Sequence, residues 1–295
     1  MAVTAEPKVD LREPASWRRT KNRIVTALMY FALVLVIVPL GFVLFTVISK
    51  GASIISGQFL TAAIPPQVLP GSIGGMGPAV VGTLEITGLA TLMAVPLGVL
   101  GAVYLNEYGG RNLLARLIGF FSDVMTGVPS IVMGLFIYAI WVVHFGFSGL
   151  AGAFALACLM LPVVIRSSDE MLKLVPNALR EGSYALGATR ARVTLTVVLP
   201  TAIGGIVSGA LLAVARAAGE TAPLLFTILT VTATNTNVFS GANTSLPSQI
   251  FSNAILPYSG AQSRAWGAAL TLIAIAFILM IVARVITARF TRLGR

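Results

Sequence analysis

Apolar residues gather in six long runs along the 295-residue chain, and segments rich in polar residues, glycine or proline separate them. The runs cover residues 24–48, 80–105, 117–143, 149–165, 193–229 and 266–286. A helix needs about 20 apolar residues to cross the ~30 Å hydrocarbon core of a bilayer. The pattern therefore predicts an all-α integral membrane protein with six transmembrane helices. The fifth run is too long for one straight crossing, and we expect Pro200 and Pro223 to break it.

Composition supports a membrane protein, because 57% of the residues are hydrophobic and only 10% are charged. Soluble domains carry about 25% charged residues. The net charge of +10 does not indicate nucleic-acid binding, since the basic residues lie between the apolar runs. The single Cys158 excludes an internal disulfide, and the single His144 excludes a histidine-based metal cluster. The first run is longer than the ~7–15 apolar residues of a signal peptide, so we expect it to be retained.

The distribution of Lys and Arg predicts the orientation in the membrane. The basic segments are the tails 1–23 and 289–295 and the loops 106–116 and 166–192. The opposite loops, 49–79 and 230–265, hold only Lys50 and Arg264. We therefore expect both termini to be cytoplasmic in a multi-pass protein of the plasma membrane. The predicted organisation is tail 1–23, first helix 24–48, outer loop 49–79, core 80–288 and tail 289–295.

The cytoplasmic loop 166–192 contains signals for a short helix. Pro176 suits a first helical turn and Gly187 suits the position just after a helix end. The predicted helix exposes apolar side chains, namely Ala178, Leu179, Ala185 and Leu186. A helix this short is not stable alone in water. It needs a surface, and periodicity leaves open whether that surface is the bilayer interface or a soluble partner.

A spacing pattern favours the soluble partner. Glu181-Gly182-Ser183 is followed by Gly187, and Val197 precedes Leu199-Pro200. This pattern resembles the EAA loop of ABC importer permeases, with Gly182 and Ser183 in place of two alanines and Val197 in place of an isoleucine. The resemblance implies a fold like that of type I importer permeases and a coupling helix seated on a cytoplasmic ATPase.

The chain itself lacks a G-x-x-x-x-G-K-[ST] phosphate loop. None of its four lysines follows a glycine-rich turn between a strand and a helix. We therefore expect a transport subunit rather than an enzyme, with no cofactor of its own and with ATP and magnesium held by a separate ATPase.

Two charged residues lie in the fifth apolar run beside a stripe of small residues. The stripe is Gly205, Gly209, Ala213 and Ala217. On a helical wheel Arg216 and Glu220 fall about 20° and 60° from Gly205, on the side expected to face other helices. The side expected to face lipid is formed by Ile203, Val207, Leu211 and Val214. An embedded arginine costs ~3 kcal/mol, and pairing at i, i+4 offsets part of that cost. The pair either orients the bundle or lies on a solute path, and we favour the second.

Three segments carry a closer resemblance. They are Ala215 to Leu225, Pro96-Leu97-Gly98 with Tyr104 to Tyr108, and Gly127 to Val132. They resemble phosphate importer permeases, the A-type subunits of the phosphate-specific transport system, and the likeness covers most of residues 74–289. It implies a homologous second permease chain, a cytoplasmic ATPase dimer and an extracytoplasmic phosphate-binding protein. Arg216 and Glu220 match the charged pair that this family places in the membrane.

The chemistry of the pair fits phosphate. A guanidinium offers forked donors to phosphate oxygens. A carboxylate can accept a hydrogen bond from the phosphate O–H, which sulfate lacks. We expect Arg216 and Glu220 to line the solute path and name Ser130, Glu85 and Asp123 as weaker candidates. Glu85 is expected near the outer interface and Asp123 near the inner one, where solvation is an alternative explanation.

Alternative functions remain open from the sequence. The permease could carry another oxyanion, such as molybdate or sulfate. An ion-coupled secondary transporter or channel is a second class, although no inverted repeat is evident. A membrane enzyme ranks last, because no His, Cys or carboxylate cluster has catalytic spacing.

Overall fold

The computed structural model describes residues 16–65, 74–110 and 112–293, and the regular structure of this part of the chain is helical throughout. The chain divides into two compact units, Met1–Ser49 and Lys50–Arg295. The first unit holds nearly all of α1 (Ser16–Gly51). The expected tail residues 1–15 lie outside the described residues, and residues 16–23 form the beginning of α1.

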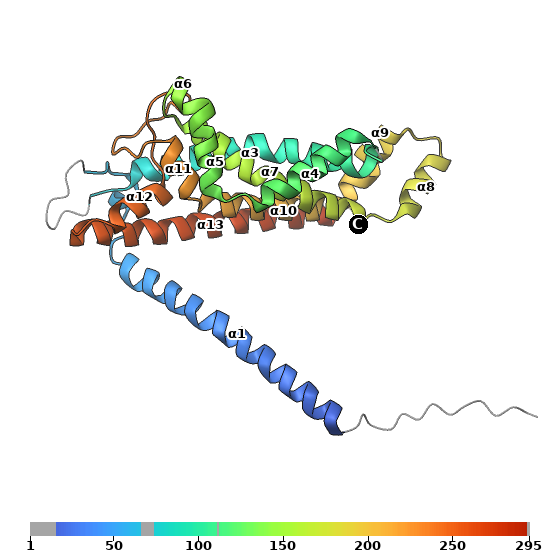
Figure 1. Cartoon of the computed structure of the whole chain (residues 1–295), viewed down its shortest axis with the longest axis horizontal. Helices are drawn as coiled ribbons and strands as arrows, with labels where there is room; N and C mark the ends of the chain where they lie inside the picture. Colours follow the sequence, from blue (N-terminus) through green and yellow to red (C-terminus); the bar gives the residue numbers. More distant parts are fainter. Residues whose placement is uncertain (1–15, 66–73, 111, 294–295) are drawn as a thin grey trace, which may run out of the picture. The chain divides into compact units, whose positions relative to one another are not determined.

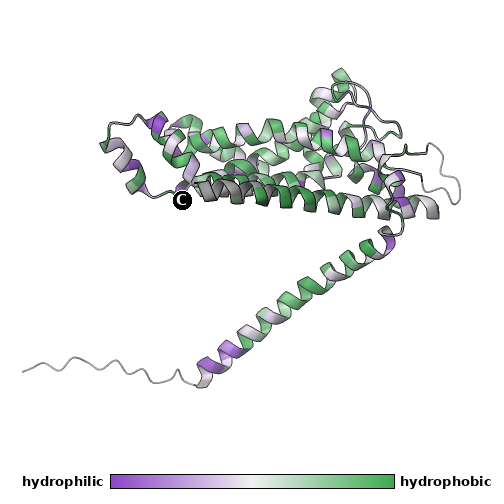
Figure 2. Cartoon of the chain, turned by 180° about the vertical axis from the view of Figure 1, so that it is seen from behind, coloured by the Kyte–Doolittle hydropathy of each residue, from purple (hydrophilic) through white to green (hydrophobic). Residues whose placement is uncertain are grey.

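The second unit is a helical bundle with three π-helical turns, η1, η2 and η3 (Figure 1). Its elements, in chain order, are α2 (Gly57–Thr61), α3 (Gly77–Val103), η1 (Tyr104–Tyr108), α4 (Leu113–Gly127), α5 (Ser130–Ile137), η2 (Tyr138–Val142), α6 (Val143–Phe145), α7 (Gly149–Lys173), α8 (Asn177–Ala185), α9 (Arg190–Val193), η3 (Thr194–Val198), α10 (Leu199–Ala218), α11 (Ala222–Thr227), α12 (Leu246–Ala254) and α13 (Ser259–Leu293). Figure 2 shows hydrophobic residues along the long helices and hydrophilic residues at the start of α1 and in the α8–α9 segment.

Five helices in the described residues are long and apolar enough to cross a membrane, and the bent pair α4 with α5–α6 makes a sixth when it is counted as one span. The all-helical membrane fold is thereby confirmed. With its 36 residues, α1 is about 54 Å long, which exceeds the hydrocarbon thickness. The predicted run 24–48 lies inside it.

The third predicted span is a bent pair of helices. The axis turns by 110° between α4 and α5. The break is at Val128, which is extended, and Pro129, whose ring disfavours the helical conformation of the preceding residue. In Figure 1, α4 lies at the end of the bundle with α8 and α9, and α6 lies at the opposite end.

The fifth run also differs from expectation at Pro200. The helical span Arg190–Ala218 continues through this proline. The π-helical turn η3 directly precedes it, and Pro200 occupies the first turn of α10, where a missing N–H costs little. The span ends at Ala218, and Pro223 lies in the first turn of the next helix, α11.

The small-residue stripe of α10 faces α7, as predicted. A Cβ atom on Gly205 would collide with Met171, and one on Gly209 would collide with Ser167. The expected lipid-facing side is wrong for Val214, which is 7% exposed and packs in the core formed with α3 and α7. The reason is that α10 also packs along α13, so two of its sides are covered.

The expected outer loop 230–265 contains α12 and the first turns of α13. Ser245 caps α12 through a reciprocal capping box with Ser248. Most polar residues in and just before α12, from Asn243 to Asn253, are buried because they bond to one another and to the backbone. The Gln249 amide donates to Thr244 Oγ1 at 3.0 Å and to the Val231 carbonyl at 3.0 Å. Arg264, expected in this loop, lies in α13 and is 1% exposed.

The loop predicted at 166–192 is also shorter than expected. The preceding helix α7 continues to Lys173, and α8 begins directly after its N-cap Pro176. Gly187, with φ of 81°, follows the C-cap residue Leu186. The predicted short helix and both of its boundary residues are confirmed.

Candidate functional site

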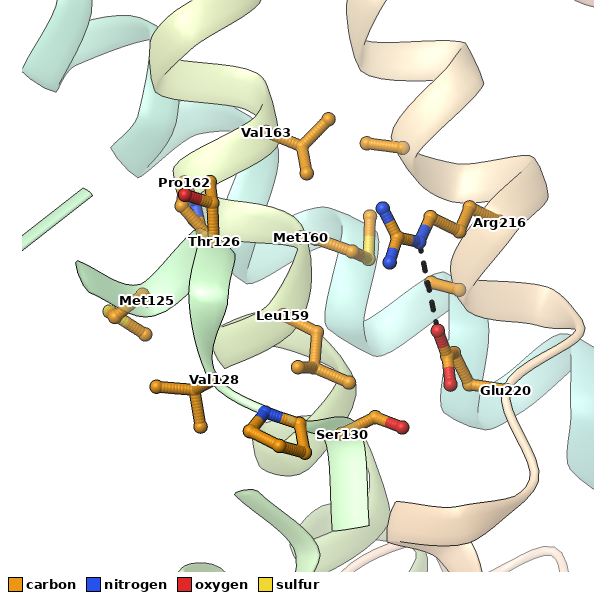
Figure 3. A pocket seen from close by; sticks show the side chains of 13 residues that line it. Met125, Thr126, Val128, Ser130, Leu159, Met160, Pro162, Val163, Arg216 and Glu220 are labelled. Atoms are coloured by element: carbon orange, nitrogen blue, oxygen red, sulfur yellow. Dashed lines mark ion pairs between the residues drawn. The ribbon is translucent and has the colours of Figure 1, made fainter. Parts of the chain in front are cut away.

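A pocket of ≈ 190 Å³ lies where the α4–α5 bend meets α7 and the end of α10. Its lining residues are Met125, Thr126, Val128, Pro129, Ser130, Leu159, Met160, Pro162, Val163, Ala213, Arg216, Ala217 and Glu220. Figure 3 shows the guanidinium of Arg216 directed from α10 into this pocket. The bend at Pro129 and the end of α10 therefore create the hollow that receives the two charged side chains.

Arg216 and Glu220 form an ion pair with 3.7 Å between Nε and Oε1. Arg216 lies in the last turn of α10, where the helix dipole favours a cation. Glu220 lies just past the helix end, and its N–H donates to the Ala217 carbonyl at 3.1 Å. At 3.7 Å the pair is an electrostatic contact rather than a hydrogen bond. The guanidinium donors therefore stay available to a bound anion.

The two charges differ in exposure. The Arg216 side chain is 73% exposed and the Glu220 side chain is 20% exposed. The expectation that both charges face other helices is wrong for Arg216 within this chain. On α10 it lies beside the covered stripe, on the open side that also carries Leu212 and Ser208. A cation on a spanning helix is found facing a bundle interior or a water-filled cavity.

The other candidates separate into two groups. Ser130 lines the pocket with Arg216 and Glu220. Asp123 does not line it and instead pairs with Arg166, with its own side chain 65% exposed. Glu85 also lies outside the lining, on α3, and its Oε2 atom is buried without a hydrogen-bond partner among the described residues.

Several lining residues were not anticipated from the sequence. Leu159, Met160, Pro162 and Val163 come from the middle of α7 and form an apolar wall. Thr126 lines the pocket from α4, but its hydroxyl donates to the Asp123 carbonyl at 2.6 Å. Nothing in the local pattern of α7 distinguishes these residues from ordinary core residues. In the described residues, no group of three His, Cys, Asp or Glu side chains could hold a metal ion.

The second set of candidates lies on and after α8. Glu181 and Gly182 are exposed, and the Ser183 hydroxyl donates to the Leu179 carbonyl at 2.8 Å. Gly187 closes the helix, since its N–H donates to the Tyr184 carbonyl at 2.9 Å. Leu199 and Pro200 lie at the start of α10. Three large apolar or aromatic side chains of the α8 segment are exposed: Leu179 at 45%, Tyr184 at 41% and Leu186 at 90%.

Comparison with known proteins supplies the family. A family model described as "Binding-protein-dependent transport system inner membrane component" matches residues 94–292. Phosphate transport system permease protein PstA 1 of Mycobacterium tuberculosis is 43% identical over 286 residues, which cover 94% of this chain and 91% of the relative. Phosphate transport system permease protein PstA of Yersinia pestis is 40% identical, with 94% of each chain covered.

Solved structures show the same fold at low sequence identity. A chain of the MetNI methionine ABC transporter in an inward-facing conformation has a TM-score of 0.62 at 18% identity, covering 73% of this chain and 95% of that one. A chain of a bacterial ABC transporter that imports the polysaccharide alginate has a TM-score of 0.59 at 15% identity, covering 92% and 99%. The protein belongs to the family of binding-protein-dependent transport system inner membrane components, together with its PstA relatives.

Proposed function

We propose that this chain is a permease subunit of an ATP-driven importer that carries inorganic phosphate across the cytoplasmic membrane. One observation carries the proposal. This chain is 43% identical to a phosphate transport permease, and its Arg216 and Glu220 meet in a pocket among its spanning helices. A second, homologous permease chain and two copies of a cytoplasmic ATPase complete the transporter. An extracytoplasmic binding protein delivers the phosphate.

The charges of the pocket suit phosphate. The guanidinium of Arg216 makes no hydrogen bond within the described residues, so its forked N–H donors are free to bind two oxygens of an oxyanion. Glu220 Oε1 lies 3.7 Å from Arg216 Nε and can accept a hydrogen bond from a phosphate O–H beside that arginine. Sulfate offers no such O–H at neutral pH. The pair therefore supplies both attraction for an oxyanion and preference for a protonated one.

Size and surroundings support the same assignment. The ≈ 190 Å³ pocket exceeds the ~30 Å³ share of one water several-fold, so a tetrahedral ion fits with a few waters. The apolar wall from α7 lowers the local dielectric, which strengthens the pull of Arg216 on an anion. The Arg216 side chain is 73% exposed, which leaves this side of the pocket open for the second permease chain to complete.

The α8 segment is the proposed contact with the ATPase. A nine-residue helix with exposed Leu179, Tyr184 and Leu186 lacks a cover for its apolar side chains. Docking in a groove of a soluble partner supplies that cover. We place α8 and both termini on the cytoplasmic side, because basic residues gather in the loop that contains α8 and in both terminal segments. ATPase closure then moves α8, the bundle changes its access, and phosphate is released inside.

Reconstitution in vesicles tests the proposal. Proteoliposomes containing the complete transporter, with ATP inside and the binding protein outside, are expected to accumulate labelled phosphate. Accumulation should require both ATP and the binding protein, and excess sulfate or molybdate should not compete. Uptake that a proton or sodium gradient drives without the ATPase would identify a secondary transporter. Faster uptake of sulfate or molybdate would assign the other oxyanion.

A further inference from the structure

Arg180, on the exposed helix α8, has a nearly buried side chain. Only 13% of it is exposed, and its partner Glu107 is 4% exposed. Arg180 Nη2 lies 2.8 Å from Glu107 Oε1, and Nε donates to the same oxygen at 3.2 Å. The two residues are 73 positions apart. Glu107 belongs to η1, the π-helical turn that ends α3, so the pair joins α8 to a different spanning helix.

Arg180 also binds the end of α7 and the segment that follows it. Nη1 donates to the Val175 carbonyl at 2.5 Å, and Nη2 donates to the Leu172 carbonyl at 3.0 Å. Nη2 also reaches Asn106 Oδ1 at 3.3 Å. The guanidinium thus bonds to η1 and to the end of α7 at the same time. A planar group with five fixed N–H donors can do this, whereas the point charge of a lysine cannot.

A second contact joins α9, the helix after α8, to the same π-helical turn η1. The Arg190 guanidinium, in α9, lies 5.3 Å from the centroid of the Tyr108 ring, a cation–π distance. Asn106 extends the network to α7, since its amide donates to Asp169 Oδ1 at 3.5 Å. Arg180 within α8 and Arg190 in the next helix are therefore both held to η1, at the end of α3.

These contacts lead to the pocket. Along its length α3 packs against α7, and Gly98 permits a close approach, because a Cβ there would lie 2.7 Å from Val164 Cγ1. Val164 directly follows the pocket-lining residues Pro162 and Val163. Besides the contacts of Arg180, α8 touches α9 and η3, and it is joined to the bundle by the short segments 174–176 and 186–189, which can bend.

We propose that Arg180 and Glu107 are positioning residues for transport: they hold α8 to α3 and α7, so that ATPase movement reaches the phosphate pocket. The inference rests on the proposed function, in which α8 is the ATPase contact. Loss of the pair leaves α8 docked on the ATPase but lets it move without the spanning helices. ATP hydrolysis then continues while phosphate transport falls.

The test measures phosphate transported per ATP hydrolysed by the complete transporter in vesicles. The variants are Glu107→Gln, Arg180→Gln and the double variant, which leaves no buried unpaired charge and so guards against misfolding. We expect the transport-to-hydrolysis ratio to fall about fivefold or more, the lower end of typical coupling between sites. Arg180→Lys should fall between the wild type and Arg180→Gln. The matched control is Arg284→Gln, which removes the same charge from an exposed position near the end of α13, outside this network, and should keep the wild-type ratio.

The outcomes separate the inference from the proposed function. An unchanged ratio in the folded double variant overturns the inference. A proportional loss of transport and hydrolysis, or loss of the ATPase from the purified complex, also overturns it, because the pair would then only build the fold or the docking surface. A Leu186→Cys probe in a Cys158→Ala background should cross-link to the ATPase. Failure of that cross-link in otherwise wild-type complex contradicts the proposed function itself.

Discussion

Gly134 permits the close approach of α5 and α11 beside the proposed phosphate pocket. It lies in α5, which begins at Ser130, and it faces Pro223 of α11, three residues after Glu220. A Cβ on Gly134 would lie 2.6 Å from Pro223 Cα and 3.0 Å from its carbonyl oxygen. Carbon atoms normally rest at about 3.5–4.0 Å, so Gly134→Ala must move the backbone of α11 away by about 1 Å.

The magnitude follows from overpacking. Such a clash costs about 1–3 kcal/mol. If the cost falls on the state that closes the pocket around phosphate, transport drops about five- to 150-fold, since 1.4 kcal/mol is tenfold. The initial rate of ATP-dependent phosphate uptake measures this effect. Size-exclusion profile and melting temperature in detergent show whether the variant is folded.

Gly88→Ala is the matched control. It is also a glycine in a spanning helix, but nothing lies within 4 Å of its added Cβ. Alanine favours a helix by about 1 kcal/mol over glycine, so this variant should be as stable as the wild type or more stable. A folded Gly134→Ala variant that transports at the wild-type rate would refute the reasoning that the α5–α11 contact sets the pocket.

Three further changes test separate parts of the structure. Glu220→Gln should reduce the preference for phosphate over sulfate in competition uptake, and unchanged selectivity would remove Glu220 from recognition. Gly187→Ala forces a residue with a side chain to φ of 81°, which costs about 1–2 kcal/mol and should weaken ATPase retention on purification without a steric clash; full retention would show that the end of α8 does not matter for docking. Ser245→Ala removes the cap of α12, costs about 1 kcal/mol and should lower the melting temperature by about 2–4 °C; an unchanged melting temperature would mean that α12 does not limit stability.

Local signals predicted the elements that depend on local chemistry. Helix α8 begins after Pro176 and ends before Gly187. A proline at a helix start and a glycine with left-handed backbone at a helix end each act on the local backbone alone. The stripe with Gly205 and Gly209 faces α7, because small residues permit close approach whichever helix arrives.

Other features depend on which helix covers which side, and the sequence pattern does not state that. Polar residues around Gln249 read as a loop, yet they are buried in and beside α12 because they satisfy one another. Val214 is apolar whether it faces lipid or α13. Pro129 indicates a break, but not that the helix axis turns by 110° and opens a pocket.

The candidate site shows the same division. Arg216 and Glu220 could be paired from their spacing of four residues. Sequence spacing could not predict the apolar wall from α7 or the link between Arg180 and Glu107, because the partners lie far apart in the chain. Such contacts appear only when the helices are packed.

The claim that Arg216 lies on the path of phosphate is tested most directly by one uptake measurement. Arg216→Ala is compared with Arg284→Ala, which removes the same charge from an exposed position near the end of α13. Charge-assisted hydrogen bonds contribute about 1.5–3 kcal/mol, which corresponds to about ten- to 100-fold in rate. We predict that fall for Arg216→Ala, with the ATPase still bound, and wild-type uptake for Arg284→Ala. Wild-type phosphate uptake by Arg216→Ala would contradict the account.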